Sequence, residues 1–294
     1  MTKATFFSLL LCIACGGTST NAEVPTPVTS GAETAQAAVS VQTGSVAAAL
    51  AGAHRSDEHR ARDVHRHPAE TLAFFGVTPE MNVVEVWPGG GWYSEVLAPM
   101  LRDHGTLVAA GFDPEDTGRR GGYERSYREK LAERPEVYDQ IEHVVLSGDA
   151  LMTGVSDASA DAVLVFRAVH NMVRDDGPVA EYFAAMARVL KPGGVLGIVA
   201  HRMPEGLDVA NDGSAGYLTE AAVIAFAEAA GFTLAERSEL NANAQDTHVH
   251  PDGVWSMPPG LRGGDEALRN LGESDRMTLR FVKAETSAAT PAAE

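Results

Sequence analysis

The chain has 294 residues, and 23 Lys and Arg against 40 Asp and Glu give it a formal net charge of −17. A hydrophobic share of 45% and a charged share of 21% are typical of a globular protein and exclude a wholly disordered chain. The acidity argues against nucleic acid as a partner, because phosphate contacts need clustered Lys and Arg.

The first 22 residues have the composition of an export signal. Lys3 precedes an apolar run over residues 4–14, and small residues follow it. This run is about half the ~20 residues that a membrane-spanning helix needs. We therefore predict a signal peptide over residues 1–22 and an exported, periplasmic or outer-membrane protein. Cys12 and Cys15 are the only cysteines and both lie in this segment, so the mature domain has no disulfide.

Residues 11–15 resemble a bacterial lipobox, in which the cysteine after a small residue is lipidated. The resemblance implies a lipoprotein anchored at Cys15, which would contact the membrane only through its lipid. Cys12 stands where Leu is usual, so simple secretion after cleavage behind Ala22 stays open as the alternative.

Low-complexity segments flank the expected domain. Residues 23–53 are mostly Ala, Thr, Ser, Val and Gly with Pro25 and Pro27, which predicts a disordered tether. A short helix at residues 45–53 is an alternative for its end. Residues 284–294 have a similar composition and are predicted to be a disordered tail. One folded domain is therefore expected over residues 54–283.

Strands and helices alternate along this domain. Pro68 is expected in the first turn of a helix that ends before Gly76. Further helices are predicted over residues 92–102, 123–134, 179–190 and 219–230, and strands over residues 83–87, 106–110, 141–146, 161–166, 195–200, 232–239 and 277–283. The alternation predicts an α/β fold, a Rossmann-like three-layer sandwich with a mostly parallel seven-stranded sheet and ligands at the carboxyl ends of its strands.

A glycine cluster follows the first of these strands. Gly89, Gly90 and Gly91 lie between the strand and a helix, where glycine lets a ligand approach the backbone and the helix start favours negative charge. Asp113 follows the second strand, where a carboxylate can accept ribose hydroxyl hydrogen bonds, and Asp149 follows the third, where it suits an exocyclic amine. A turn or cap explains any one of these residues, but their order favours a nucleotide-like ligand.

Several motifs together resemble the class I S-adenosylmethionine-dependent methyltransferases. They are the strand 83–86 with its glycine loop, Gly148-Asp149, residues 161–164, and the turn Leu-Lys-Pro-Gly-Gly at residues 190–194. More narrowly, residues 62–63, 66–68, 85–93 and 273–277 resemble a group of exported bacterial methyltransferases of unassigned substrate. The resemblance implies S-adenosyl-L-methionine as the cofactor and an antiparallel last strand in the sheet.

The resemblance also implies roles for individual residues. The loop 85–91 would hold the methionine part of the cofactor, with Glu85 near its ammonium group. Asp113 would take the ribose, Asp149 the adenine, and Arg167 would border the cofactor or the substrate.

Two positions depart from the family's pattern. Trp87 stands where the family usually has its first loop glycine. Asp113 lies about two residues after Gly111, near which the ribose carboxylate is expected.

The catalytic candidates follow the fourth and fifth predicted strands. Methyl transfer needs positioned reactants and, for an oxygen or nitrogen nucleophile, a base. We predict His170 and Asn171 as catalytic residues, and His201 occupies the corresponding place after the next strand. The long segment 241–264 is expected to be a lid or substrate loop. Its His248 and His250 match no fixed metal pattern, so no metal site is predicted, with metal binding as the alternative.

These observations predict a methyltransferase that acts on a small molecule by in-line transfer. A second reading is an exported binding module that kept the fold without catalysis, since the cofactor is made in the cytoplasm. A third is a nicotinamide oxidoreductase, because Gly89, Gly91 and Ser94 approach a dinucleotide fingerprint. The oligomeric state is not predicted.

Overall fold

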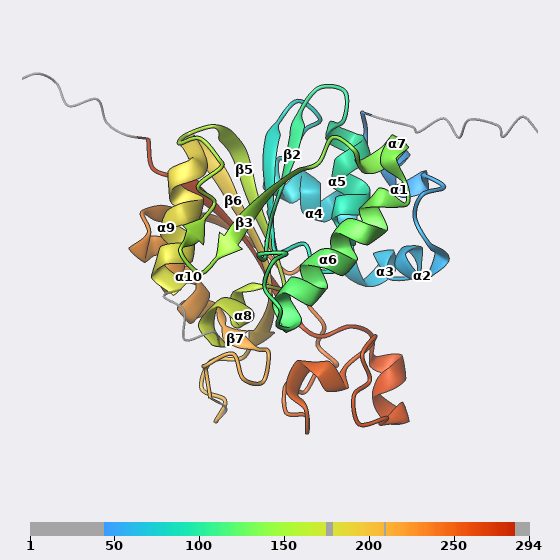
Figure 1. Ribbon diagram of the computed structural model, residues 1–294. Helices are drawn as coiled ribbons and strands as arrows, with labels where there is room; N and C mark the ends of the chain where they lie inside the picture. The colour runs from blue at the N-terminus through green and yellow to red at the C-terminus, as the bar shows by residue number, and fades with distance from the viewer. Residues whose placement is uncertain (1–43, 175–178, 209, 286–294) are drawn as a thin grey trace, which may run out of the picture. The chain divides into compact units, whose positions relative to one another are not determined.

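The strands of the fold pair into one mixed sheet (Figure 1). The computed structural model describes residues 44–174, 179–208 and 210–285, all within one compact unit. The strands are β1 (Asn82–Val86), β2 (Thr106–Gly111), β3 (Glu142–Ser147), β4 (Ala150–Leu151), β5 (Ala160–Phe166), β6 (Leu190–Met203), β7 (Leu218–Thr219), β8 (Phe232–Ser238) and β9 (Arg276–Lys283). Their order in the sheet is β4-β3-β2-β1-β5-β6-β9-β8, with β7 beside β6.

The central part of the sheet is parallel. β3, β2, β1, β5 and β6 all run in one direction, so their carboxyl ends meet at one edge. β9 lies antiparallel between β6 and β8. Seven long strands with an antiparallel last strand confirm the predicted Rossmann-like fold, to which β4 and β7 add two-residue strands.

Helices cover both faces of the sheet, as Figure 1 shows for α9 and α10 on one face and α4 and α5 on the other. The helices are α1 (Val46–Ala51), α2 (Asp57–Arg60), α3 (Asp63–Arg66), α4 (Pro68–Phe75), α5 (Ser94–Leu101), α6 (Arg119–Ala132), α7 (Pro135–Tyr138), α8 (Val169–Arg174), α9 (Val179–Val189) and α10 (Glu220–Ala229). Alternate strand residues therefore face two apolar cores: Val84 and Val163 point to one, and Val83 and Leu164 to the other.

Local signals fix several helix ends where the sequence places them. Pro68 is the first residue of α4, and Gly76 ends it with a φ of 72°, a conformation that favours glycine. Thr219 precedes α10 and its hydroxyl accepts a hydrogen bond from the Ala222 N–H. These two predicted helices are confirmed.

The predicted end of the tether at residue 53 is wrong, and its helical alternative is correct. Residues 46–51 form α1, in which Ala49 is fully buried among the apolar side chains on the α5 face of the sheet. The N–H of Gly44 also donates to the Pro99 carbonyl. Small alanines pack closely without a large apolar stripe, which is why composition alone suggested a tether. Residues 1–43, with the predicted signal, Cys15 and most of the tether, and residues 286–294 of the predicted tail lie outside the described residues.

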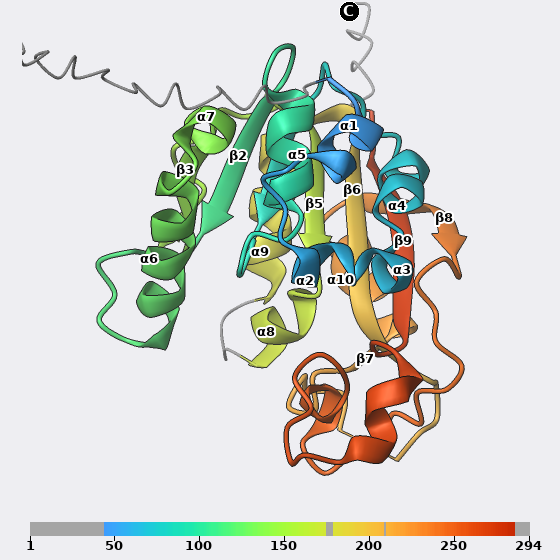
Figure 2. The same ribbon diagram turned by 90° about the vertical axis from the view of Figure 1, so that its right-hand side faces the viewer.

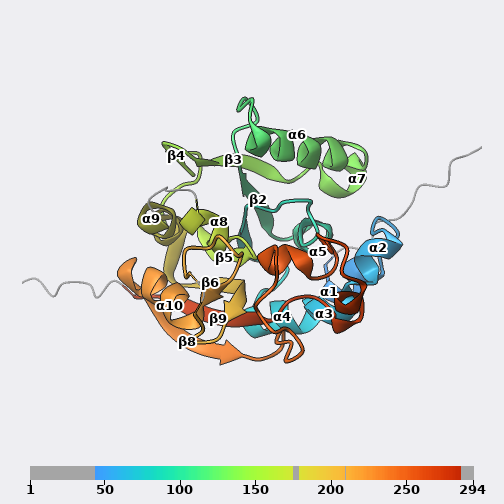
Figure 3. The same ribbon diagram turned by 90° about the horizontal axis from the view of Figure 1, so that it is seen from below.

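A long connection leads from β8 to β9. It contains the short 3₁₀ helices η1 (Gly253–Ser256) and η2 (Glu266–Leu271), and it lies at the edge where β1, β2 and β5 end (Figures 2 and 3). The connection thus covers the ligand-binding edge of a parallel sheet. None of the helices in the described ranges is long and apolar enough to span a membrane.

Candidate functional site

A cavity of about 750 Å³ opens at the carboxyl edge of the sheet. This volume lies within the range of ligand pockets in proteins. Residues at the ends of β1, β2, β5 and β6 form its floor, while α2, α6, α8 and the β8–β9 connection form its walls. The lining residues on which the site is built are His59, Arg62, Trp87, Gly89, Gly90, Trp92, Gly111, Glu124, Arg167, His170, Asn171, His201, Trp255, Arg262, Glu273 and Ser274.

The glycine loop after β1 leaves open space beside its backbone. Gly89 has a φ of 60°, and a Cβ built on Gly89 or Gly90 would meet no atom within 4 Å. Both glycines line the cavity, so a ligand can approach this backbone closely. Gly91 is not part of the lining, and a Cβ built on it would meet the Tyr127 ring at 2.9 Å.

Trp87 occupies the place of the family's first loop glycine. Its φ of 47° is the left-handed conformation that a bulky residue rarely adopts. The indole Nε1–H donates to the Leu146 carbonyl at 2.8 Å, and the indole ring lies 4.9 Å from the Phe112 ring. The side chain therefore bridges the ends of β1 and β3 and forms part of the cavity floor. Packing holds in place a backbone conformation that is otherwise strained.

A buried carboxylate from α6 lies at the end of β2. A Cβ built on Gly111 would overlap Oε2 of Glu124, so this carboxylate fills the space of a side chain at the last residue of β2. Glu124 is 3% exposed; it accepts hydrogen bonds from the Phe112 N–H at 3.2 Å and from Arg128 Nε at 2.6 Å. Sequence reasoning missed Glu124, because nothing in the local pattern of α6 marks it as facing β2.

Five of the predicted site residues line the cavity: Gly89, Gly90, Arg167, His170 and Asn171. Asp113 does not, and its carboxylate accepts a hydrogen bond from the Glu115 N–H within its own turn. Asp149 lies in the turn between β3 and β4, also away from the lining. Ribose and adenine binding by these two aspartates stay predictions.

Glu85 is buried beneath the glycine loop. Ser94 Oγ donates to its carboxylate at 2.6 Å, and the side chain does not reach the cavity lining. Burial raises the pKa of Glu85 to about 7, against the opposing effect of the Ser94 hydrogen bond. Binding of a ligand ammonium by Glu85 stays a prediction.

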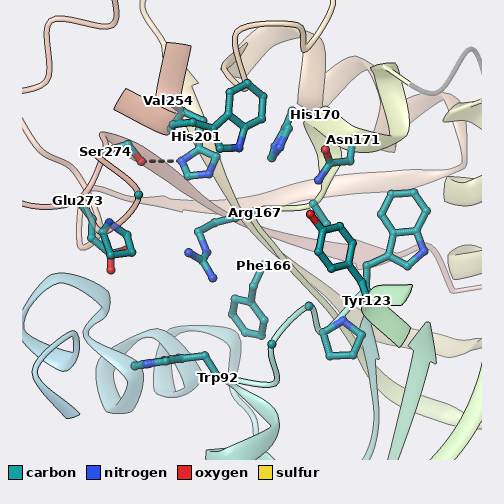
Figure 4. Close-up of a pocket in the computed structure, with 18 of the residues that line it drawn as sticks. Trp92, Tyr123, Phe166, Arg167, His170, Asn171, His201, Val254, Glu273 and Ser274 are labelled. Carbon is teal, nitrogen blue, oxygen red and sulfur yellow. Dashed lines mark hydrogen bonds between the residues drawn. The ribbon is translucent and has the colours of Figure 1, made fainter. Parts of the chain in front are cut away.

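Two histidines from neighbouring strand ends meet in the cavity (Figure 4). The ring centroids of His170, on α8, and His201, on β6, are 5.4 Å apart. Nδ1 of His201 lies 2.6 Å from Ser274 Oγ, whereas no described residue is a hydrogen-bond partner for Nδ1 of His170. Burial, followed by Arg174 and Arg167, lowers the pKa of His170 to about 3 and burial also lowers that of His201, so both rings are neutral at neutral pH.

Two histidines in the long segment between β8 and β9 contact carboxylates of the same segment. His250 Nε2 lies 2.8 Å from Asp246 Oδ1, and His248 Nε2 lies 3.2 Å from Asp275 Oδ2. The described part of the chain contains no group of three His, Cys, Asp or Glu side chains that could hold a metal ion. The segment nevertheless forms a wall of the cavity through Trp255 and Arg262, as its length suggested.

Comparison with protein families identifies the type of domain. Residues 85–198 match the family model described as a methyltransferase domain. The chain carries a methyltransferase domain over these residues. The matched residues run from β1 to β6 and include the glycine loop and His170. This confirms the predicted activity class and cofactor. It does not support the alternative of a nicotinamide oxidoreductase. A comparison with curated proteins gives no match.

Solved structures show the same fold at low sequence identity. An S-adenosylmethionine-dependent methyltransferase from Aquifex aeolicus is 18% identical over 76% of this chain and 92% of its own, with a TM-score of 0.50. A proposed sarcosine dimethylglycine methyltransferase from Galdieria sulphuraria is 17% identical over 78% and 88%, with a TM-score of 0.51. The [4+2]-cyclase SpnF is 16% identical over 75% and 81%, with a TM-score of 0.50. These likenesses establish the fold.

Proposed function

We propose that this methyltransferase domain transfers a methyl group to a small organic acceptor by in-line displacement. The observation that carries the proposal is the continuity of one cavity from the glycine loop at β1 to the His170–His201 pair at β5 and β6. When bound, the cofactor supplies a methyl group activated by its sulfonium. The protein's part is to hold donor and acceptor in line and to keep water out.

The cofactor end of the cavity fits the methionine and ribose parts of S-adenosylmethionine. Open space beside Gly89 and Gly90 accommodates a group lying against the backbone. The Glu124 carboxylate lines the cavity at the end of β2, where it can accept hydrogen bonds from two ribose hydroxyls. We therefore assign ribose binding to Glu124, with Asp113 as the alternative carboxylate.

The acceptor end is assigned to the histidine side of the cavity. His170 and Asn171 both line it from α8, and Nδ1 of His170 has no partner in the described structure. A neutral imidazole with a free nitrogen can accept a hydrogen bond from an acceptor group and so orient it. Ser274 fixes the His201 ring beside it.

Binding of the cofactor product is the first test. All three tryptophans of the chain, Trp87, Trp92 and Trp255, line the cavity, so intrinsic fluorescence reports directly on its occupation. We expect S-adenosylhomocysteine to change the fluorescence and release heat in calorimetry with the full chain, and NADH to release none. Absence of both signals with S-adenosylhomocysteine contradicts the proposal.

Transfer is tested with S-adenosylmethionine labelled in its methyl group and a small-molecule extract of the source cells. We expect label in the small-molecule fraction and none in precipitated protein or nucleic acid. Label found in either precipitate would contradict a small-molecule acceptor.

The alternative is a binding module that kept the fold without catalysis. It is supported by Trp87, a bulky residue with positive φ where the family has glycine. Cofactor binding without turnover on any acceptor supports this alternative, and turnover excludes it.

We also propose that the protein is exported and anchored through Cys15. The apolar run at residues 4–14 and the lipobox-like residues 11–15 support this location. Expressed in a bacterium, the full chain is expected in the membrane fraction, and Cys15→Ser is expected to move it to the soluble fraction. Recovery of both proteins in the cytoplasm contradicts export.

A further inference from the structure

Positive charge gathers at the acceptor end of the cavity. Arg62, Arg66 and Arg276 all bond to one carboxylate, that of Glu273, at 2.6, 3.1 and 3.1 Å. Arg167 faces the same carboxylate and makes a fourth arginine around it. The arrangement is unexpected in a chain of net charge −17, and one carboxylate leaves this cluster of four arginines with excess positive charge.

Of the four arginines, Arg62 and Arg167 line the cavity, and Arg62 is bonded to Glu273, which leaves the Arg167 guanidinium. In Figure 4 it lies between Glu273, Ser274 and His201 on one side and Trp92 and Phe166 on the other. No described residue forms a hydrogen bond or an ion pair with this guanidinium. The backbone N–H of Arg167 donates to the Val199 carbonyl at 2.6 Å. Arg167 also has a φ of 56°. An unpaired cation on a strained backbone inside a cavity is a feature of binding sites rather than of packing.

The surrounding arginines are also incompletely satisfied. Arg66 is 1% exposed; its guanidinium carbon lies 4.6 Å from the centre of the Trp92 ring, and its Nη1 and Nη2 have no hydrogen-bond partner in the described structure. Buried charged nitrogens without partners are costly, which favours a ligand that supplies negative charge.

We propose that the acceptor substrate carries an anionic group, a carboxylate or a phosphate, which Arg167 binds at the wall formed by Glu273 and Ser274. This inference rests on the proposed methyltransferase function and adds the chemical class of its acceptor. The guanidinium donates paired hydrogen bonds to such oxyanions, with His201 and its Ser274 partner beside it.

Electrostatics link this anion to the cofactor. S-adenosylmethionine has a sulfonium and an ammonium group against one carboxylate, so it adds a positive charge to a cavity that arginines already line. An anionic acceptor offsets that repulsion, because charges interact more strongly in a poorly solvated cavity than in water. The acceptor's anion is therefore expected to bind more tightly beside S-adenosylmethionine than beside S-adenosylhomocysteine, whose thioether carries no charge.

The test separates the acceptor's anion from the cofactor's own carboxylate. Benzoate and inorganic phosphate are titrated by calorimetry into the full chain, both free and saturated with S-adenosylhomocysteine, and neutral benzamide serves as the comparison. We expect one of the two anions to bind the saturated protein at least ten times more tightly than benzamide. Tighter binding of benzoate would indicate a carboxylate on the acceptor, and tighter binding of phosphate would indicate a phosphate group.

Variants locate the anion. Arg167→Gln is expected to weaken anion binding at least tenfold and to change the affinity for S-adenosylhomocysteine less than threefold, and Arg167→Lys should retain part of the binding. Arg237→Gln on β8, away from the cavity lining, is the matched control and should change neither. Thermal unfolding of each variant checks that it is folded.

Three results would overturn the inference: no anion binding, equal binding of benzamide, or a loss of S-adenosylhomocysteine affinity in Arg167→Gln that shows the arginine holding the cofactor. If S-adenosylhomocysteine fails to bind the wild type, the proposed function fails instead. The titration of the free protein still reports whether Arg167 binds an anion.

Discussion

The carboxylate of Glu124 lies where a side chain of Gly111 would be. A Cβ on Gly111 would overlap Oε2 of Glu124, so the two positions exclude each other's side chains. The glycine at the end of β2 thus makes room for an acid that arrives from α6. A carboxylate is therefore present where the family pattern predicts one, but it comes from another element.

Glu124→Gln is expected to weaken binding of S-adenosylhomocysteine by roughly 10- to 100-fold. A hydrogen bond to a charged group contributes about 1.5–3 kcal/mol, and ribose offers two hydroxyls to this carboxylate. Asp113→Asn is the matched control, because Asp113 lies outside the cavity lining, and it should change the affinity less than threefold. Calorimetry on both variants tests the assignment. Weaker binding by Asp113→Asn and normal binding by Glu124→Gln would mean that Asp113 binds the ribose.

Much of the fold could be predicted because its signals are local. Pro68 and Gly76 mark the two ends of α4, and short apolar runs containing Val form β1 and β5. The site depends on contacts between residues distant in sequence: Arg62 and Glu273 are 211 positions apart, and no periodicity encodes their pairing. The motifs containing these two residues were visible in the sequence, but their common position in the cavity was not. Glu124 carried no signal at all, because its role depends on the space left by Gly111.

Gly90→Val is expected to weaken cofactor binding without unfolding the protein. A Cβ on Gly90 would meet no protein atom within 4 Å, so the side chain would extend into the cavity. Affinity for S-adenosylhomocysteine should fall more than tenfold, while the midpoint of thermal unfolding stays near that of the wild type. Gly122→Ala on α6, where a Cβ also has room, is the control and should bind normally. Normal binding by Gly90→Val would show that the cofactor lies elsewhere.

Glu85→Gln is expected to remove a pH dependence of stability. Burial raises the pKa of Glu85 from 4.5 to about 7 in the folded state, so the folded protein holds this proton more tightly than the unfolded chain. The free energy of unfolding should therefore fall between about pH 4.5 and 7, by roughly 3 kcal/mol in total, and stay level above that range.

The variant keeps a neutral side chain at every pH, so it should match the wild type near pH 4 and be the more stable protein at pH 8. Urea unfolding at both pH values measures the difference. Glu58→Gln, at an exposed position on α2, is the control. Equal destabilisation of Glu85→Gln at both pH values would mean that packing, and not ionisation, decides the effect.

Glu273→Gln is expected to destabilise the protein by about 3–5 kcal/mol at pH 7, because removing one partner leaves buried guanidinium groups uncompensated. Burial favours protonation of Glu273, but the surrounding arginines, Arg66 first, outweigh it and lower the pKa to about 2. A lowered pKa means that the stabilisation is complete above about pH 4.5 and is lost as the pH falls toward 2. The difference in the free energy of unfolding between wild type and variant should therefore shrink in acid.

Urea unfolding at pH 7 and pH 3 measures this difference. Glu266→Gln, in an exposed pair with Arg269, is the control and should leave stability unchanged. Sulfate should restore part of the variant's stability by supplying negative charge to the arginines. A variant as stable as the wild type at pH 7 would show that this carboxylate does not hold the cluster together.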